Sequence, residues 1–532
     1  MKEKKISIRR WAIVAFSGLL LSITSVWGYQ IENYHELIFG WSTTGLVLLF
    51  WVLISAALLL LFWLFDRAKV KQSRVCARRS EGRMYLVFVA ALLVVYAIHF
   101  LALYPGLFVF DAPHQMEIYT SGQITEHHPV LHTLIVGFLI TTVSNITGSF
   151  NHGVAVYTIV QIFVAVLCFA YVLTYVHRKV KNWWVTGFSF LFLSCFTPIV
   201  LQVLSLTKDS YFFVVLVLAS TLTVEMVDEP RGFMDKKWKG ILWMLSVVCT
   251  AIFRNNCIYA IPFLLVGALL CVKEKRKTLL LLVGGIAVLG LLYSKVFVPA
   301  VTVRGIDQRE LLSVPIQQMA RIYYDEEADV TEEERALIKQ LITKEGIEGY
   351  VPTISDPAKN HFDMELYEVN ASYYNKLYLD LVLRNPKLSL DSFLENTCGF
   401  WYPGCELTLL WDGTKGYWVT ECYWPAETNS KIDFLYEYYK LFESSDFATG
   451  NTVTAILFAP GTFFYLFVIM FAYAIDSARK SFCVVFGFVF VLWLTYLLGP
   501  VALVRYAIYL YALVPLYLVQ ILGEQRVLQR VK

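Results

Sequence analysis

Histidines and carboxylates concentrate in one short polar segment, residues 104–132. It holds four of the chain's nine histidines, together with the carboxylates Asp111, Glu117 and Glu126. Lysine and arginine are absent from the whole stretch 84–176. Carboxylates and imidazoles are the side chains that most often move protons in catalysis. A titratable loop that is free of cations and lies between apolar runs indicates an active site rather than a plain connector.

A carboxylate of this loop that lies beside a hydroxyl can take its proton as a general base while the oxygen attacks a carbon. His128 and His132 also have the four-residue spacing of helical metal ligands. No third ligand follows at a fixed spacing, however, and Pro129 does not suit a helix there. Hydrogen bonding to a substrate, or packing of the loop, is therefore favoured, and no residue is assigned to a metal. The candidate substrate-binding residues of the loop are His114, Gln115, His127, His128 and His132.

Further charged residues lie in short turns at the ends of apolar runs. The turns are SLTKDS, FRNN and GPVALVRY. Ionisable groups at such places are costly unless they pair or bind a ligand, and several cations around one carboxylate predict an anionic ligand. The alternative is that the cations extend to the membrane surface and that Asp209 caps the helix beginning at Ser210. The candidates from these turns are Lys208, Asp209, Arg254, Asn255, Arg505 and Tyr506.

The composition indicates the class of protein that positions these groups. Of the 532 residues, 57% are hydrophobic and only 16% are charged, and the apolar residues form runs long enough to cross a bilayer. We therefore expect an all-α, multi-pass protein of the cell membrane. Nothing in the sequence implies a nucleic-acid partner.

The lysines and arginines between the runs predict the orientation, because they gather on the cytoplasmic side. The loop after the second run is strongly basic and is expected inside, so the next span carries segment 104–132 to the outside. The basic turn after residue 176 must again be inside, so only one of the runs 130–146 and 153–176 crosses. The shorter run, 130–146, is predicted to be a helix in the outer interface. The basic loop contains Arg67, Lys69, Lys71, Arg74, Arg78, Arg79 and Arg83.

Twelve spans are expected in total, with both termini cytoplasmic and the active site external. Residues 1–83 form an accessory hairpin with its basic loop, residues 84–298 a transmembrane core with the catalytic loop 104–133, residues 299–451 a mostly helical external cap domain, and residues 452–532 the last three spans and a basic tail. The spans lie near residues 11–29, 41–64, 84–103, 153–176, 185–203, 211–226, 241–253, 258–272, 279–298, 452–474, 482–498 and 506–522.

The predicted cap domain contains two local helix signals. Thr331 followed by Glu334 predicts a capping box that opens a helix through about residue 343. Residues 374–384 read as a second helix, ended by Asn385 and Pro386. Three cysteines of the same region, Cys398, Cys405 and Cys422, can form one disulfide or remain as thiols.

Several motifs carry a family resemblance. YPGLFVFDAPHQ, HHPVLH, LTKDS, FRNN and SVPIQQMAR resemble an uncharacterised group of multi-pass, glycosyltransferase-like proteins of Gram-positive bacteria. An aspartate in the first large external loop, an interfacial helix after it and a large external domain before the last spans resemble the GT-C superfamily of membrane glycosyltransferases. The resemblance implies a lipid-linked sugar donor, specifically a polyprenyl-phosphate sugar, a cell-envelope glycan or polymer as acceptor, and transfer of a hexosyl or pentosyl group with inversion.

By that resemblance Asp111 is the base, and Lys208, Arg254 and Arg505 bind the lipid phosphate. Two features depart from the superfamily pattern: two spans precede the span that leads to the catalytic loop, and FDAPHQ offers a single acid. The single acid leaves a requirement for a divalent cation open. A transporter, or a ligase or export component for lipid-linked polymers, remains the alternative. A transporter would show matched halves with broken helices, which the sequence does not reveal.

Overall fold

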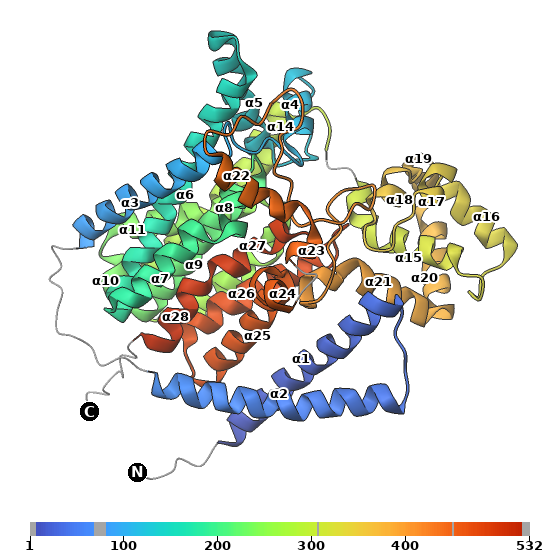
Figure 1. Cartoon of the computed structure of the whole chain (residues 1–532), viewed down its shortest axis with the longest axis horizontal. Coiled ribbons are helices and arrows are strands. Elements are labelled where there is room, and N and C mark those ends of the chain that lie inside the picture. Colours follow the sequence, from blue (N-terminus) through green and yellow to red (C-terminus); the bar gives the residue numbers. More distant parts are fainter. Residues whose placement is uncertain (1–6, 69–80, 306–307, 449–451, 524–532) are drawn as a thin grey trace.

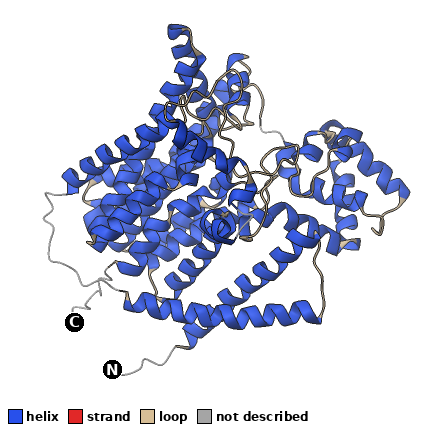
Figure 2. Cartoon of the chain, in the orientation of Figure 1, coloured by secondary structure: helices blue, strands red, loops and turns tan. Residues whose placement is uncertain are grey.

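The computed structural model describes residues 7–68, 81–305, 308–448 and 452–523. Across these ranges the chain folds into helices joined by loops, and the pairings between extended residues are isolated bridges rather than strands (Figure 2). Within the described residues, eight helices are long and apolar enough to cross a membrane, or nine if one bent pair counts as a single span. The predicted class, an all-α multi-pass membrane protein, is confirmed. The number twelve remains a prediction.

The eight long helices differ in how they are covered. The apolar part of α9 is 94% buried within the protein, whereas that of α2 is only 11% buried. The leucine-rich surface of α2 is therefore left for contact with lipid. Continuous helices are the form that satisfies backbone polar groups in a bilayer. The eight are α1 (Ile8–Tyr34), α2 (Trp41–Arg67), α3 (Glu81–Ala102), α5 (Val130–Thr147), α6 (Phe150–Val180), α9 (Lys208–Asp228), the run Arg276–Val301 and the run Val504–Leu522.

Four predicted spans correspond to shorter apolar helices, each of 17 residues. A bilayer core requires about 20 residues of helix, so their length alone does not make them spans. They are α11 (Lys237–Phe253), the run Asn255–Cys271 with η2 (Asn255–Tyr259) and α12 (Ile261–Cys271), α25 (Pro460–Asp476) and α26 (Lys480–Tyr496). Helix α5 meets the length and hydropathy of a span, so its predicted interfacial position also stays a prediction.

Two of the predicted spans are broken. The run expected at 185–203 divides into α7 (Trp183–Cys195) and α8 (Thr197–Leu204), which meet at an angle of 48°. Phe196 has an extended backbone there and Pro198 begins the second helix. The run 452–474 divides in the same way, into α24 (Thr452–Phe458) and α25, at a residue followed by Pro460. Both breaks lie next to a proline, which cannot continue a preceding helix without loss of a hydrogen bond.

The amino-terminal hairpin is tied to the end of the chain. Helices α1 and α2 lie below the bundle in Figure 1, and α1 packs against α25 and α21 (Pro386–Trp401). Arg10 joins the two helices to α25, because it contacts Asp66 at 2.9 Å and Asp476 at 2.6 Å. Part of the basic sequence used to orient the chain lies outside the described residues: Lys69, Lys71, Arg74, Arg78 and Arg79, and the tail after residue 523.

Residues 313–384 form a helical lobe with its own hydrophobic cluster, at the right of Figure 1. The capping box is confirmed, since Glu334 N–H donates to Thr331 Oγ1 at 3.2 Å and Thr331 N–H to Glu334 Oε2 at 2.9 Å. The second predicted helix is also present and ends at Arg384. The lobe contains α15 (Ser313–Tyr324), α16 (Glu332–Leu341), α17 (Lys344–Glu348), α18 (Asp356–Asn360), α19 (Met364–Val369) and α20 (Ala371–Arg384), preceded by η4 (Gln308–Leu312).

The second half of the region predicted as a cap packs differently. Pro386 starts α21 directly after α20, and buried residues of α21 and the following loop, such as Cys398 and Trp401, join the main hydrophobic core. Cys398, Cys405 and Cys422, for which the sequence left both a disulfide and thiols open, are free cysteines, and Cys422 Sγ donates to the Gly106 carbonyl at 3.0 Å. The remaining short helices are α10 (Pro230–Met234), α22 (Asp433–Lys440), η5 (Leu441–Glu443) and α23 (Ser445–Ala448).

Candidate functional site

Asp111 stands at the start of α4 (Ala112–Thr120), and its side chain makes no capping hydrogen bond to that helix. The loop before it is joined to the turn after α8: Leu107 N–H donates to the Leu204 carbonyl and Leu206 N–H to the Leu107 carbonyl, both at 2.9 Å. Phe110 then adopts a left-handed backbone, with φ of 56°. This local path presents the Asp111 carboxylate to groups outside its own helix.

Five charged side chains from four separate parts of the chain meet at this point. Asp111 accepts from Arg505 Nη1 at 3.1 Å and Arg505 Nη2 at 3.3 Å, and it lies 3.0 Å from Lys208 Nζ. Asp209 pairs with Arg254 at 2.5 Å and with Arg505 at 3.5 Å. We call Asp111, Lys208, Asp209, Arg254 and Arg505 the ion cluster. The sequence named all five, and the structure brings them together.

The ion cluster carries one more positive than negative charge. Its members are largely shielded from solvent, with Asp209 0% and Arg505 8% exposed. Burial raises the pKa of Asp111, but Arg505 and Lys208 outweigh it and hold that pKa well below its ordinary value. Asp111 is therefore an ionised carboxylate at neutral pH. Since burying charges costs more than a salt bridge usually returns, stability alone does not account for such a cluster.

Aromatic rings enclose the two arginines. The Arg254 guanidinium lies 4.8 Å from the Tyr496 ring centre and 4.3 Å from that of Tyr506. Arg505 lies 4.8 Å from the Phe110 ring centre, and its Nη2 donates to the Tyr506 hydroxyl at 3.0 Å. Tyr506 was among the predicted site residues, whereas Tyr496 and Phe110 were missed. Phe110 adjoins the predicted base, but nothing in the sequence indicated Tyr496.

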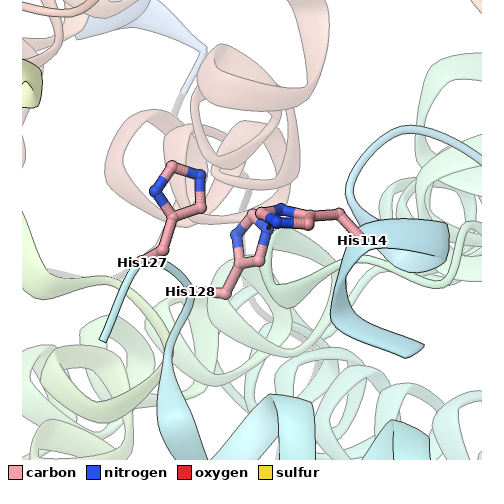
Figure 3. Close-up of side chains that lie close together, drawn as sticks. All are labelled: His114, His127 and His128. Atoms are coloured by element: carbon pink, nitrogen blue, oxygen red, sulfur yellow. Dashed lines mark hydrogen bonds between the residues drawn. The ribbon is translucent and has the colours of Figure 1, made fainter. Parts of the chain in front are cut away.

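Three of the predicted histidines meet beside the ion cluster (Figure 3). His114 Nδ1 lies 3.0 Å from His128 Nε2, and the His127 ring centre is 4.6 Å from that of His128. His128 Nδ1 lies 3.2 Å from Lys208 Nζ and 4.0 Å from an Asp111 oxygen. We call His114, His127 and His128 the histidine triad. Burial lowers the pKa of both His127 and His128, and the Lys208 ammonium adds to this effect at His128.

His132 belongs to a different arrangement. It lies in α5, fully buried, with Nδ1 3.0 Å from Gln115 Oε1 and Nε2 2.7 Å from the Tyr157 hydroxyl. Both ring nitrogens are thus engaged, so the four-residue spacing from His128 does not make a metal pair. Gln115 also donates to Thr133 at 3.1 Å, and these contacts hold α4 against α5. Both predicted residues position the loop rather than face the ion cluster.

The predicted site residue Asn255 directly follows Arg254 in the chain. It is exposed at the start of η2. Its neighbour Asn256, which was not predicted, donates to Thr495 Oγ1 at 2.8 Å and so links η2 to α26.

An open apolar groove also adjoins α4, lined by Tyr119, Leu134, Ile135, Phe138 and Leu139.

The sequence profile of a family of unknown function, DUF6020, matches residues 107–530. The matched stretch contains the whole ion cluster and the histidine triad, and it begins after α1, α2 and α3. No curated protein and no solved structure matches the chain significantly.

Proposed function

Because the chain belongs to the DUF6020 family, whose function is unknown, we propose a function from the site itself: a membrane glycosyltransferase that uses a polyprenyl-phosphate sugar as donor. The observation that carries this proposal is that Arg505 and Lys208 both form ion pairs with Asp111. A potential base and two potential phosphate ligands occupy one buried place. The acceptor would be a glycan or polymer of the cell envelope, and the active site would face outward.

The resting contacts suggest how a donor would enter. Arg505 binds Asp111 through two nitrogens, which is the geometry that guanidinium also uses for phosphate. A phosphate that takes Arg505 and Lys208 therefore replaces the Asp111 carboxylate as their partner. Arg254 keeps Asp209 as its own counter-ion in this exchange. The exchange leaves Asp111 without the cations that suppress its basicity, so that it becomes a better proton acceptor as the donor binds.

The proposed reaction is a single displacement. The acceptor hydroxyl oxygen attacks the anomeric carbon, and its proton passes to Asp111. The bond between that carbon and the phosphate oxygen breaks, and its electron pair leaves with the phosphate. Arg505 and Lys208 stabilise the charge that develops there. One displacement inverts the configuration at the anomeric carbon.

The membrane arrangement fits a lipid-linked donor. The ion cluster is formed at the ends of α9, α11 and α27 (Val504–Ala512), so that a headgroup reaches it while an acyl or prenyl chain lies against helices. The apolar groove along α4 and α5 is one surface for such a chain. The placement of the cluster at the outer face rests on the distribution of lysine and arginine. The twelve-span arrangement with both termini in the cytoplasm belongs to the same proposal.

One observation favours the alternative of a transporter. Transporters build their binding sites at interrupted helices, and the interrupted pair α7–α8 leads directly into the turn that carries Lys208 and Asp209. In a transporter the cations would bind an anionic substrate, and Asp111 would serve as their counter-ion when the site is empty. This reading needs no proton transfer and no bond cleavage.

The test is a transfer assay with purified protein in lipid nanodiscs. Each of a panel of polyprenyl-phosphate hexoses and pentoses is supplied with envelope polymer from a strain that lacks the gene, and the products are identified by mass spectrometry. Transfer of sugar by the wild type, lost in Asp111→Asn while donor binding is retained, supports the enzyme. Uptake of the same lipids or of soluble anions into vesicles, without chemical change, would instead establish the transporter.

A further inference from the structure

The histidine triad brings three imidazoles from two separate segments into contact. His114 comes from α4, and His127 and His128 come from the loop before α5. Each ring offers one nitrogen atom, and these three nitrogen atoms all lie within 4.8 Å of one another. His114 and His127 are exposed, whereas His128 is buried. Figure 3 shows the three rings close together, and two of the three residues are exposed to solvent.

The hydrogen bonds indicate which nitrogen atoms are available. The Lys208 ammonium has only donors, so His128 Nδ1 accepts from it, and the ring proton of neutral His128 lies on Nε2. His128 Nε2 then donates to His114 Nδ1 at 3.0 Å. The two nitrogens that face each other thus share one proton. A metal ion can take the place of that proton once the His128 ring proton moves to Nδ1, because the two nitrogen atoms face each other.

We infer that the histidine triad is a binding site for a borderline transition-metal ion of the Zn²⁺ class, with His114, His127 and His128 as its three protein ligands. Neutral imidazoles suit zinc, copper or nickel rather than magnesium or calcium, which prefer oxygen. A fourth, open coordination position faces the exposed side. The test of this site measures metal binding alone, so its outcome does not depend on the proposed transferase activity.

The distances fit such an ion. Two nitrogens at about 2.0 to 2.1 Å from a tetrahedral zinc ion lie about 3.3 Å apart. His114 Nδ1 and His128 Nε2 are 3.0 Å apart, so a slight opening accommodates the metal. His127 is exposed, and its ring can approach by rotation about its own side-chain bonds. The positive charge of Lys208 opposes metal binding, but it lies at the opposite edge of the His128 ring, and Asp111 partly neutralises it.

Metal binding would reverse the hydrogen bond of His128 toward the ion cluster. With the metal on Nε2, the ring proton moves to Nδ1. Lys208 can then no longer hydrogen-bond to Nδ1, because both groups are donors. The Asp111 carboxylate, 4.0 Å from Nδ1, then becomes the acceptor. Metal ligands commonly donate their second N–H to a carboxylate in this way, and the contact fixes the orientation of both groups. The metal would thus hold residues 127–128 against α4 and orient the candidate base.

Zinc titration of the full-length protein tests the site. The protein is purified in detergent without a histidine tag, stripped with chelator and titrated against a chromogenic zinc indicator. The wild type is expected to bind one ion at this site, and His114→Ala and His127→Ala are each expected to weaken that binding by about tenfold or more. Exposed His361, in the lobe, provides the matched control His361→Ala. Thermal unfolding of the metal-free variants verifies that they fold.

A second group of potential ligands, Glu32, Cys398 and Cys405, makes the experiment discriminating. Cobalt bound by the histidine triad gives visible ligand-field bands without the near-ultraviolet band of cobalt–thiolate bonds. Cys398→Ser should leave the triad's zinc affinity unchanged. The inference is overturned if the wild type binds no zinc, if the triad variants bind it as tightly as the wild type, or if binding disappears in Cys398→Ser.

Discussion

Asp111 and Arg505 are 394 residues apart in the chain, yet two nitrogens of the Arg505 guanidinium lie 3.1 and 3.3 Å from the Asp111 carboxylate oxygens. The pair joins the residue that precedes α4 to the first turn of α27. It links the beginning and the end of the stretch that matches the DUF6020 family. Because the two residues are in contact, variants of either one test the same site.

Replacement of Asp111 by asparagine is expected to lower the rate of sugar transfer by about 10²-fold or more, the usual scale for a positioned general base. The amide keeps the size of the side chain but cannot take the acceptor proton. Glu117→Gln, an equivalent change on an exposed position of the same helix, is the control and should leave turnover unchanged. Near-normal turnover in Asp111→Asn would move the role of base to another carboxylate, Asp209 first.

Arg505→Lys is expected to weaken donor binding although it keeps the charge, because lysine cannot make the two-nitrogen contact. Loss of a charge-assisted contact costs on the order of 1.5 to 3 kcal/mol, or about one to two decades in affinity. Binding of a fluorescent polyprenyl-phosphate sugar measures the effect. Arg231→Lys, at an exposed salt bridge with Glu274, is the control. Unchanged affinity in Arg505→Lys would contradict the assignment of Arg505 to the phosphate.

Arg254 calls for a different variant, because its removal leaves Asp209 buried and partly unpaired. Breaking a buried ion pair costs about 3 to 5 kcal/mol, so Arg254→Ala is expected to lower the melting temperature markedly. Arg254→Lys keeps a counter-ion for Asp209 and should fold. Its donor affinity, compared with that of Arg505→Lys, separates a direct phosphate contact from a supporting one. Equal melting temperatures for Arg254→Ala and the wild type would refute the buried pair.

The pH dependence follows from the low pKa of Asp111 in the resting protein. A carboxyl group with a pKa below about 3.9 is ionised throughout the range from about pH 5 to pH 7, so Asp111 should not reduce kcat/KM there. When the donor phosphate takes Arg505 and Lys208, the Asp111 pKa rises. The acidic limb of kcat is therefore expected at higher pH than that of kcat/KM. Coincident limbs in the two profiles would argue against the exchange of partners.

The orientation is tested by labelling single cysteines on intact cells with a membrane-impermeant maleimide, in a background without other reactive thiols. Val369→Cys lies at an exposed position of the helical lobe and is expected to react. Lys273→Cys, in an exposed basic turn predicted to be cytoplasmic, should react only after the cells are opened. The reverse pattern would put the ion cluster inside the cell and remove the basis for an external reaction.

Local sequence signals predicted a substantial part of this protein. Apolar runs and their length indicated a helical membrane protein, since a bilayer offers the backbone no other partners. Thr331 and Glu334 predicted their capping box because the interaction spans three residues and needs no distant partner. Asp111, Lys208, Asp209, Arg254 and Arg505 were identified because charges at the ends of apolar helices are costly without a purpose.

The partners of those residues were decided by the tertiary structure. The approach of α26 to the end of α11 puts Tyr496 beside Arg254, and the approach of α27 to the start of α4 puts Arg505 beside Asp111. No spacing in the sequence encodes such contacts. The same holds for the histidines: spacing paired His128 with His132, but Pro129 ends the loop where α5 begins, and the fold brings His114 to His128 instead. Helix periodicity predicts neighbours within one element. Contacts between elements depend on how helices pack and where prolines break them, and these are properties of the whole chain.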